Sequence, residues 1–340
     1  MEGSTATTTA PRPAGARTLI LILLSTLLAA RSAAGADPAN RPLMTIPERL
    51  HLLVVAPHPD DETLGAGGLM QRVQKHGGRV SVAYLTSGDG YVDGVELETN
   101  SLKPKPEDFV DYGERRLQEA LRALQTIAIS QKRLFVFGFP DGGLRDLLTT
   151  HWSSKNPFVS PYTGDSRPPY SQSLSRETTY SGVALERELA RLIIRLNPGW
   201  VAVTGPWDLH PDHCAAFHFV VRSLRRIRSS DRSFVPPRVL AYTVHRPDWP
   251  GFSEGTSLDA PPNVSADGAT WQFLDLTSAE LDGKGRALDQ YTSQMNIMAI
   301  LFRGFVRPNE VFAVYSKLPI EPTDSCGGPS PSSGEARGAR

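Results

Sequence analysis

Two short polar clusters contain residue types that bind metal ions and transfer protons. The first is Pro57–Glu62 (PHPDDE), which follows the apolar run Leu52–Ala56 and precedes a glycine-rich stretch. The second is His210–His213 (HPDH), which follows the apolar run Trp200–Val203. Each cluster is therefore predicted to lie on the turn that leaves a strand, which is where an α/β protein carries its binding residues.

Together the two clusters can build a catalytic metal site. A hydrolytic zinc ion takes about three protein ligands of His or carboxylate type and keeps one position open for a water molecule, whose pKa it lowers to roughly 7. His58, Asp61 and His213 could supply those ligands. Asp60 and His210 would then stand beside the ion without ligating it, free to transfer a proton and to stabilise negative charge.

Each cluster alone has a simpler structural explanation. Proline fixes φ and aspartate bonds its own backbone, so a single His-Pro-Asp sequence can be an ordinary turn. Two such turns, both after hydrophobic strands and both rich in metal-binding side chains, favour the catalytic interpretation.

Several ordered motifs resemble the LmbE/PIG-L family of metal-dependent N-deacetylases. They are APHPDDETLGAGG at 56–68, GERRLQEALRAL at 113–124, FGFPDGGL at 137–144, HPDH at 210–213 and KGRALDQYTSQ at 284–294. The resemblance implies hydrolysis of an N-acetyl group from an N-acetylglucosamine-type amino sugar or its conjugate. The alternatives are a secreted carbohydrate-binding or inactive relative, and an amidase that acts on another acylated substrate.

The resemblance also implies a role for each residue of the two clusters. His58, Asp61 and His213 match the family's metal ligands. Asp60 matches the general base, and His210 matches the histidine that stabilises the oxyanion. The ion in the family is usually Zn²⁺, and two histidines with one carboxylate also suit Fe²⁺. All five residues are present, which favours an active enzyme over a binding protein.

Further residues are candidates for supporting roles. Asp212 could hold His210 oriented and cationic by a hydrogen bond or by its charge. Arg115 or its neighbour Arg116 could reach a sugar hydroxyl or a phosphate from a helix, although a solvated helix face is the simpler alternative. Asp141, which follows a predicted strand, could contact the substrate or serve as a turn residue.

Other positions have two interpretations that the sequence leaves open. Glu62 begins a predicted helix, where its carboxylate could complement the helix dipole or contact the substrate. Residues 151–180 show no helical or strand period and are predicted to form a long loop near the site. Four aromatic residues of this loop could stack on sugar faces or pin the loop to the body of the protein: Trp152, Phe158, Tyr162 and Tyr170.

The hydrophobic pattern predicts an α/β fold, in which a Rossmann-like open, mostly parallel sheet has helices on both faces. We expect strands near 51–56, 79–86, 133–138, 199–205 and 238–244, and helices near 63–76, 107–127, 181–196 and 212–228. The ligands would meet at the carboxyl edge of this sheet. Gly65–Gly68 lacks the GxGxxG spacing of a dinucleotide site, so these glycines are expected to let a helix pack closely behind the metal turn.

Charge and cysteine content limit the partners of the protein. The chain has 36 Lys and Arg against 36 Asp and Glu, so nothing favours nucleic acid or an anionic surface. We expect a small amino-sugar conjugate as the partner, and the sequence leaves the oligomeric state open. The two cysteines predict no disulfide framework, and Cys214 is expected to pack in the core as an apolar residue. In an exported protein Cys214 and Cys326 would be free thiols or form a bond that the sequence does not predict.

The two ends of the chain are expected to lie outside the catalytic domain, which we place at 37–320. Arg12 and Arg17 precede the apolar run Leu19–Leu28, and small residues follow at 34–36, so residues 1–36 are predicted to be a signal peptide. The protein would then be secreted or exported, with no membrane span in the mature chain. The alternative is an uncleaved membrane anchor. Residues 321–340 are rich in Gly, Ser and Pro and are predicted to be disordered.

Overall fold

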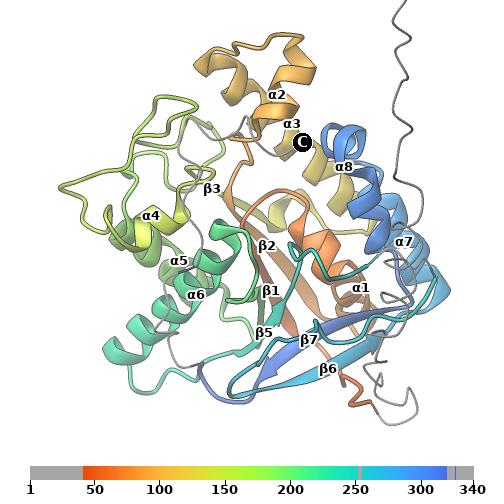
Figure 1. The fold of residues 1–340 in the computed structure, drawn as a ribbon. Coiled ribbons are helices and arrows are strands. Elements are labelled where there is room, and N and C mark those ends of the chain that lie inside the picture. Colours follow the sequence, from red (N-terminus) through yellow and green to blue (C-terminus); the bar gives the residue numbers. More distant parts are fainter. Residues whose placement is uncertain (1–40, 252–254, 320–325, 327–340) are drawn as a thin grey trace, which may run out of the picture. The chain divides into compact units, whose positions relative to one another are not determined.

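The computed structural model describes residues 41–251, 255–319 and 326, and within them the central element is a seven-stranded sheet (Figure 1). The strand order is β3-β2-β1-β4-β5-β7-β6, in which β1 to β5 run parallel and β7 is antiparallel to both of its neighbours. The strands are β1 (His51–Ala56), β2 (Arg79–Thr86), β3 (Leu134–Phe139), β4 (Trp200–Thr204), β5 (Arg238–Tyr242), β6 (Ala269–Asp275) and β7 (Asn309–Tyr315). The predicted signal peptide, and the predicted tail apart from Cys326, lie outside the described residues.

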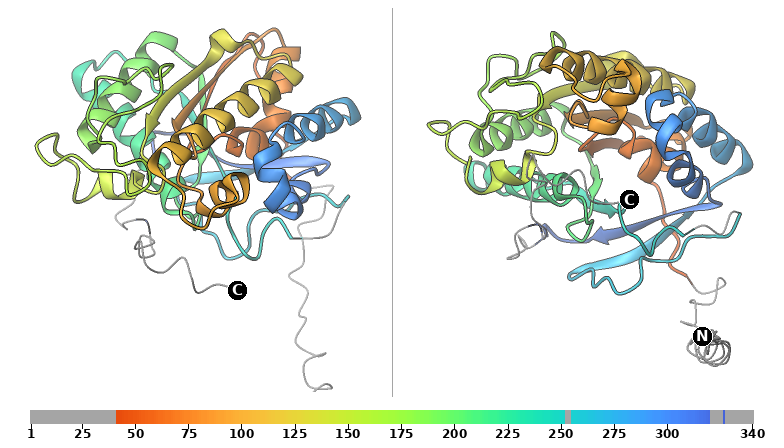
Figure 2. Two further views of the ribbon diagram at one scale, coloured as in Figure 1. Left: turned by 90° about the horizontal axis from the view of Figure 1, so that it is seen from above. Right: turned by 45° about the horizontal axis from the view of Figure 1, so that its top comes forward.

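Helices cover both faces of the sheet, as the sequence predicts for a parallel sheet (Figure 2). One layer contains α1 (Asp61–Lys75), α3 (Pro106–Thr126), α7 (Ser278–Leu288) and α8 (Thr292–Gly304). The other contains α4 (Leu144–Leu148), α5 (Gly182–Leu196) and α6 (Pro211–Ser230). The short helix α2 (Val92–Thr99) packs on α3, and the 3₁₀ turn η2 (Gln131–Arg133) precedes β3.

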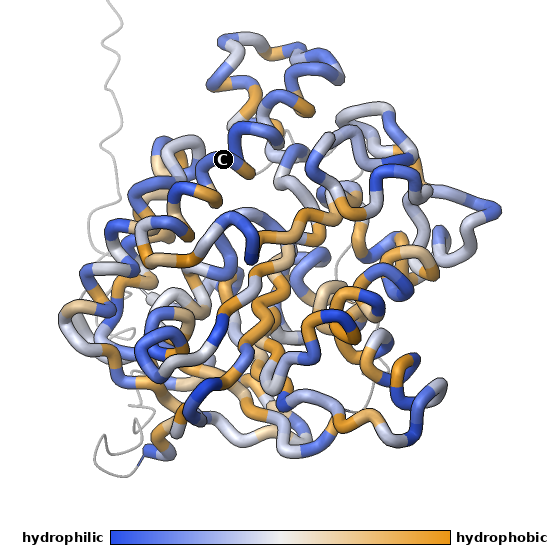
Figure 3. The backbone as a smooth tube through the Cα atoms, turned by 180° about the vertical axis from the view of Figure 1, so that it is seen from behind, coloured by the Kyte–Doolittle hydropathy of each residue, from blue (hydrophilic) through white to orange (hydrophobic). Residues whose placement is uncertain are grey.

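The side chains of β1 point alternately to the two faces of the sheet, so this one strand contributes to two hydrophobic cores. Leu52 and Val54 belong to the core beneath α1 and α3, whereas Leu53 and Val55 belong to the core beneath α5 and α6. Successive side chains of a strand point to opposite faces, so a strand buried on both sides must be apolar throughout. Figure 3 shows hydrophobic residues concentrated along the central strands.

The five predicted strands and four predicted helices are confirmed within a few residues at their ends. Strands β6 and β7 and four helices were not predicted from the sequence. Two of these helices have weak patterns, because α7 contains Gly283 and Gly285, and α8 is broken by non-helical backbone at Met298. The residues 151–180, all of them described, contain no helix or strand, as predicted. No helix in the described part of the chain is long and apolar enough to cross a membrane.

The glycines that follow the first polar cluster allow α1 to approach the sheet closely. A Cβ atom on Gly65 would lie 2.0 Å from the ring of Tyr242 in β5, and one on Gly68 would lie 2.3 Å from the side chain of Leu276. Real Cβ atoms do not approach other atoms this closely, so a side chain at Gly65 would displace the Tyr242 ring, and one at Gly68 would displace the end of the Leu276 side chain. The close packing expected from the sequence is confirmed.

Cys214 is buried in the core beneath α5 and α6, as expected, and the structure settles the state of the two cysteines that the sequence left open. Cys214, near the start of α6, forms a disulfide with Cys326, with 5.5 Å between their Cα atoms. Cys326 lies in the segment that was predicted to be disordered, and its backbone oxygen also accepts a hydrogen bond from Arg145. The sequence could not reveal this pair, because 112 residues separate the two cysteines in the chain.

We expect the Cys326→Ser variant to be less stable than the wild type by about 2–5 kcal/mol, because a bond that closes a long loop restricts the unfolded chain. Urea unfolding of both proteins, with and without reductant, measures this difference. Reductant should destabilise the wild type and leave the variant unchanged. Equal effects of reductant on both proteins would show that the disulfide does not form.

Candidate active site

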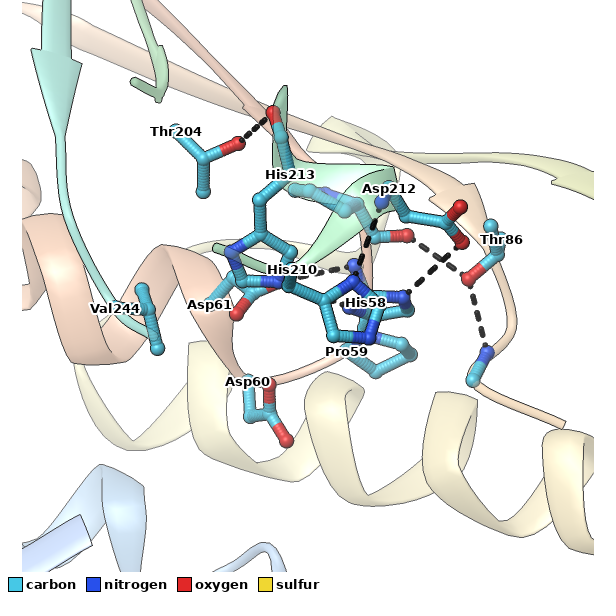
Figure 4. Close-up of polar contacts among 12 residues, drawn as sticks. His58, Pro59, Asp60, Asp61, Thr86, Thr204, His210, Asp212, His213 and Val244 are labelled. Atoms are coloured by element: carbon cyan, nitrogen blue, oxygen red, sulfur yellow. Dashed lines mark hydrogen bonds and ion pairs between the residues drawn. The ribbon is translucent and has the colours of Figure 1, made fainter. Parts of the chain in front are cut away.

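Three buried donor atoms converge at the carboxyl edge of the sheet (Figure 4). His58 Nδ1 lies 3.2 Å from Asp61 Oδ2, Asp61 Oδ2 lies 3.2 Å from His213 Nε2, and the two histidine nitrogens are also 3.2 Å apart. Donors placed 2.0–2.2 Å from a tetrahedral zinc ion are separated by about 3.3–3.6 Å. The three predicted ligands are therefore brought together at a spacing that fits Zn²⁺ or Fe²⁺.

The strand order explains why these residues meet. His58 lies on the turn after β1, and Asp61 is the first residue of α1. His213 lies in the first turn of α6, directly after the loop that leaves β4. Since β1 and β4 are parallel neighbours, the loops at their carboxyl ends lie side by side.

Carboxylates contact the ring nitrogens that face away from the convergence point. His58 Nε2 lies 3.0 Å from Asp141 Oδ1 and 3.5 Å from Asp212 Oδ2, and His213 Nδ1 lies 3.3 Å from Asp208 Oδ2. Such outer carboxylates fix the ring orientation of metal-binding histidines and raise their basicity. Their presence is a second observation that fits a metal site.

The electrostatics of the three donors favours a cation. Although burial acts in the opposite direction, His213 and His58 hold the pKa of Asp61 well below its usual range. Burial lowers the pKa of His213, but Asp61 and Asp208 outweigh it and raise the pKa to about 9. These buried carboxylates thus attract positive charge to the point where the donors converge.

Asp208 organises much of this edge of the sheet with one carboxylate. Its Oδ1 accepts the backbone N–H of His210, and its Oδ2 accepts those of Val244 and His245 in addition to facing His213. We expect Asp208→Asn to weaken metal binding by about 10–100-fold, as is typical when an outer partner is lost. Competition with a chelator of known affinity measures the change. An unchanged affinity would show that Asp208 does not orient His213.

Asp60 occupies an unusual position at the start of α1. It is the N-cap residue, with φ 137°, and its Oδ2 accepts a hydrogen bond from Arg116 Nη2 at 2.9 Å. Burial raises the pKa of Asp60 to about 8, although the guanidinium of Arg116 opposes the increase. A carboxyl group with a pKa near neutrality can both accept a proton and return it.

The ring of His210 lies next to those of His58 and His213, the two histidines of the donor triangle. Its ring centroid lies 4.7 Å from that of His58 and 4.8 Å from that of His213. Burial, together with these histidines, holds the pKa of His210 well below its usual range, which favours the neutral ring. Its Nδ1 accepts the backbone N–H of Asp212 at 3.3 Å, which places the proton on Nε2.

Asp212 is placed differently from its expected role. Its carboxylate accepts the N–H groups of Gly142 (2.8 Å) and Leu144 (3.0 Å) and faces His58. The contact with His210 comes from the backbone of Asp212, and the lowered pKa of His210 disfavours the cationic ring that was expected. The Asp212 carboxylate therefore connects the loop that contains Asp141 and Gly142 to His58 at the edge of the sheet.

A cavity of about 240 Å³ opens beside these residues. His58, Asp60 and His210 line it on one side, and Met298, Leu301 and Phe302 of α8 form an apolar wall. The remaining lining residues are Leu64, Gly90, Tyr91, Arg116, Asp141, Gly142, Tyr162, Pro211, His245 and Gln294.

Of the two candidate arginines, Arg116 lines the cavity and Arg115 does not. Arg116 lines it and is 4% exposed, with further hydrogen bonds to the carbonyls of Pro59 and Gly88. Arg115 points to the surface, where its Nε contacts Glu98 Oε1 at 2.7 Å and half of the side chain is exposed. The structure thus brings Arg116 and Asp141 to the site and leaves Arg115 outside it.

The four aromatic residues of the long loop were expected either to stack on sugar faces or to pin the loop, and the structure places them differently from one another. Tyr162 lines the cavity and packs against Phe109. Tyr170 is fully buried and donates a hydrogen bond to Asp89, so it pins the loop. The other two face the body of the protein: Trp152 lies under Arg222, and Phe158 packs on His151.

The sequence analysis missed two residues of the site. Asp208 lies two residues before His210, and its position in the same turn could have suggested it. His245 follows β5, which is the neighbour of β4, and its ring centroid lies 4.8 Å from that of His213. Nothing near His245 in the sequence resembles the two polar clusters, so only the strand order identifies it.

Known proteins resemble this chain in sequence and in fold. The PIG-L family, described as GlcNAc-PI de-N-acetylase, matches residues 53–224, just over half of the chain. A diacetylchitobiose deacetylase of Thermococcus kodakarensis is 26% identical over 170 residues. That match covers 48% of this chain and 44% of the relative, so the chain spans less than half of the relative's length.

Two solved structures share the fold. The pseudoaglycone deacetylase Dbv21 has a TM-score of 0.50 and 17% identity, over 78% of this chain and 98% of that one. A triple mutant of a deacetylase from the teicoplanin biosynthetic pathway has a TM-score of 0.50 and 15% identity, over 78% and 97% of the two chains. At these identities the likeness shows a common architecture.

Proposed function

We propose, from the premise that the chain belongs to the PIG-L family, that it is a metal-dependent hydrolase that removes an N-acetyl group from an N-acetylglucosamine-type amino sugar or its conjugate. The observation that carries the proposal is the convergence of His58, Asp61 and His213. The buried Asp60 lies next to them and, with His58, lines a cavity. The deacetylase names of the relatives support the same reaction class.

The site can divide the chemistry between an ion and the side chains. A bound Zn²⁺, or Fe²⁺, supplies Lewis-acid polarisation of the acetyl carbonyl and a water molecule of lowered pKa. Asp60 accepts a proton from the attacking water and returns it to the departing amine. Arg116 holds the Asp60 carboxylate in place during both transfers. His210, protonated on Nε2, donates a hydrogen bond to the negative charge that develops on the carbonyl oxygen.

The size and lining of the cavity support one amino-sugar unit as the bound part of the substrate. A volume of about 240 Å³ is below the roughly 300–1,000 Å³ of pockets that enclose drug-sized ligands. Asp141 and Arg116 offer polar contacts for hydroxyl groups, and Tyr162 offers an aromatic face. The rest of a conjugate would extend out of the cavity.

We also propose that the protein is exported. The Cys214–Cys326 disulfide supports this location, because structural disulfides persist in oxidising compartments and are rare in the cytosol. An uncleaved N-terminal anchor remains the alternative to secretion. Expression of the full chain, followed by N-terminal sequencing of the exported product, distinguishes cleavage at the predicted site from retention of the anchor.

The first experiment combines metal analysis with amine release. The chain from Asp37 is loaded with Zn²⁺ or Fe²⁺ and incubated with N-acetylglucosamine conjugates, with and without a chelator. Chelator-sensitive amine release is the expected result. Bound metal without release would favour an amidase that acts on another acyl group, and neither metal nor release would favour the carbohydrate-binding alternative.

A further inference from the structure

We infer that Glu62 and Tyr291 are positioning residues that hold the Asp60 turn in its reactive conformation. The inference rests on the proposed function for the role of Asp60. It also assigns a purpose to the motif at 284–294, which none of the steps above uses.

The backbone of Asp60 needs external support. Its φ of 137° lies in a region that residues with a Cβ rarely adopt. Such conformations persist when surrounding contacts over-determine them, and they are concentrated at functional sites. The direction of the Asp60 carboxylate depends on this backbone geometry. Contacts that hold the backbone of Asp60 therefore also orient its carboxylate.

Glu62 provides that support from inside the protein. It is fully buried, and its Oε2 accepts the backbone N–H of Asp60 at 3.1 Å. Its Oε1 accepts hydrogen bonds from the hydroxyls of Thr63 and Tyr291. Glu62 is absent from the cavity lining, so the substrate-contact interpretation is not supported within the described residues.

Tyr291 links this turn to a distant part of the chain. It is fully buried at the N-cap of α8, 229 residues after Glu62, and its hydroxyl donates to the Glu62 carboxylate. Tyr291 thereby fixes the orientation of the Glu62 carboxylate. A buried carboxylate that accepts a charge-assisted hydrogen bond has little freedom to rotate. Removing the hydroxyl leaves Glu62 with fewer constraints.

The rest of the motif fastens the Tyr291 segment to the helices of the site. Lys284 pairs with Glu310 at 2.7 Å, and the Glu310 carboxylate also accepts the N–H groups of Gly68 and Leu69 in α1. Ser293 Oγ donates to Glu119 of α3 at 2.6 Å.

A second contact of this segment reaches the helix that carries Arg116. Gln294 Nε2 donates to the hydroxyl of Tyr112 at 2.8 Å, and Gln294 also lines the cavity. The α7–α8 junction is thus bonded to α1, which begins after Asp60, and to α3, which supplies Arg116. Both supports of Asp60, at its backbone and at its carboxylate, belong to one connected set of contacts.

The test compares Tyr291→Phe with Tyr180→Phe. Tyr180 is an equally buried tyrosine whose hydroxyl donates to the Gly138 carbonyl at 3.0 Å, so both variants lose one buried hydroxyl. We expect Tyr291→Phe to lower kcat about tenfold, with KM and metal content unchanged, while Tyr180→Phe keeps the wild-type kcat. Equal kcat values for the two variants would overturn the inference.

Conservative replacement of Glu62 gives a second comparison. Glu62→Gln keeps an oxygen that can accept the Asp60 N–H, so most of the activity should remain. Glu62→Ala removes the acceptor and should lower kcat further than Tyr291→Phe. If the Gln variant loses as much as the Ala variant, the acceptor role of Glu62 is wrong.

Hydrogen exchange keeps the test independent of the proposed function. We expect the peptide covering 57–64 to exchange faster in Tyr291→Phe than in the wild type or in Tyr180→Phe. If the wild type releases no amine, the proposed function fails, and the exchange result alone decides whether Tyr291 holds the turn. Exchange that is equal in all three proteins would overturn the inference even if the enzyme is active.

Discussion

Replacing Asp60 with Asn is expected to lower kcat by about 10²–10⁴-fold while metal content stays at the wild-type level. The amide cannot accept a proton from water, but it has the size of the carboxylate and can still contact Arg116. Asn matches Asp in size and is enriched at positive φ to a similar degree, so the turn should survive the replacement. Metal analysis and steady-state kinetics on the same preparation measure both quantities.

The control for this variant is Asp289→Asn. Asp289 is an exposed aspartate that pairs with Arg303, and the change should affect neither metal content nor kcat. If Asp60→Asn loses the metal, then Asp60 is a ligand and its role has been confused with that of Asp61. If it keeps both metal and turnover, the base is another group.

The His213→Ala variant is expected to lose the metal and with it the activity. His213 is completely buried, and its Nε2 forms one corner of the donor triangle, so the truncated site offers two donors. The affinity should fall by more than the roughly 10–100-fold that is typical when an outer partner is removed. Metal stoichiometry after dialysis against a weak chelator provides the measurement.

A surface histidine serves as the control for this loss. His76 lies at the end of α1, partly exposed beside Glu48, and His76→Ala should retain the metal. Unchanged stoichiometry in His213→Ala would mean that another set of donors holds the ion. His245 would then become the first candidate, since it lies within reach of Asp61 as well.

The parallel part of the fold could be read from the chain because its signals are local. β1 and β4 are continuous apolar runs, and each leads into a turn with His and Asp. Strands of this kind are buried on both faces, which requires helices on either side. The antiparallel strands β6 and β7 have no polar cluster of this kind at their ends, β6 follows a long irregular stretch and β7 follows α8, so nothing local marked the pair.

The site was predictable only to the extent that a single turn contains the chemistry. His58, Asp60 and Asp61 share one turn, and His210 and His213 share another, so their convergence required only that β1 and β4 be neighbours. Asp212 shows the limit of this reasoning. Its place in the HPDH motif suggested a contact between its carboxylate and His210, but the helix directs that carboxylate to the loop that contains Gly142.

By itself, the sequence determined the parallel α/β architecture and the donor residues that build the edge of the sheet. Tertiary structure decided which neighbour on a helix faces inward, because successive helical residues point about 100° apart, so Arg116 reaches the cavity while Arg115 pairs with Glu98. It also decided the disulfide and the Glu62–Tyr291 contact. These pairs join residues far apart in the chain, and their proximity depends on the order in which strands and helices pack.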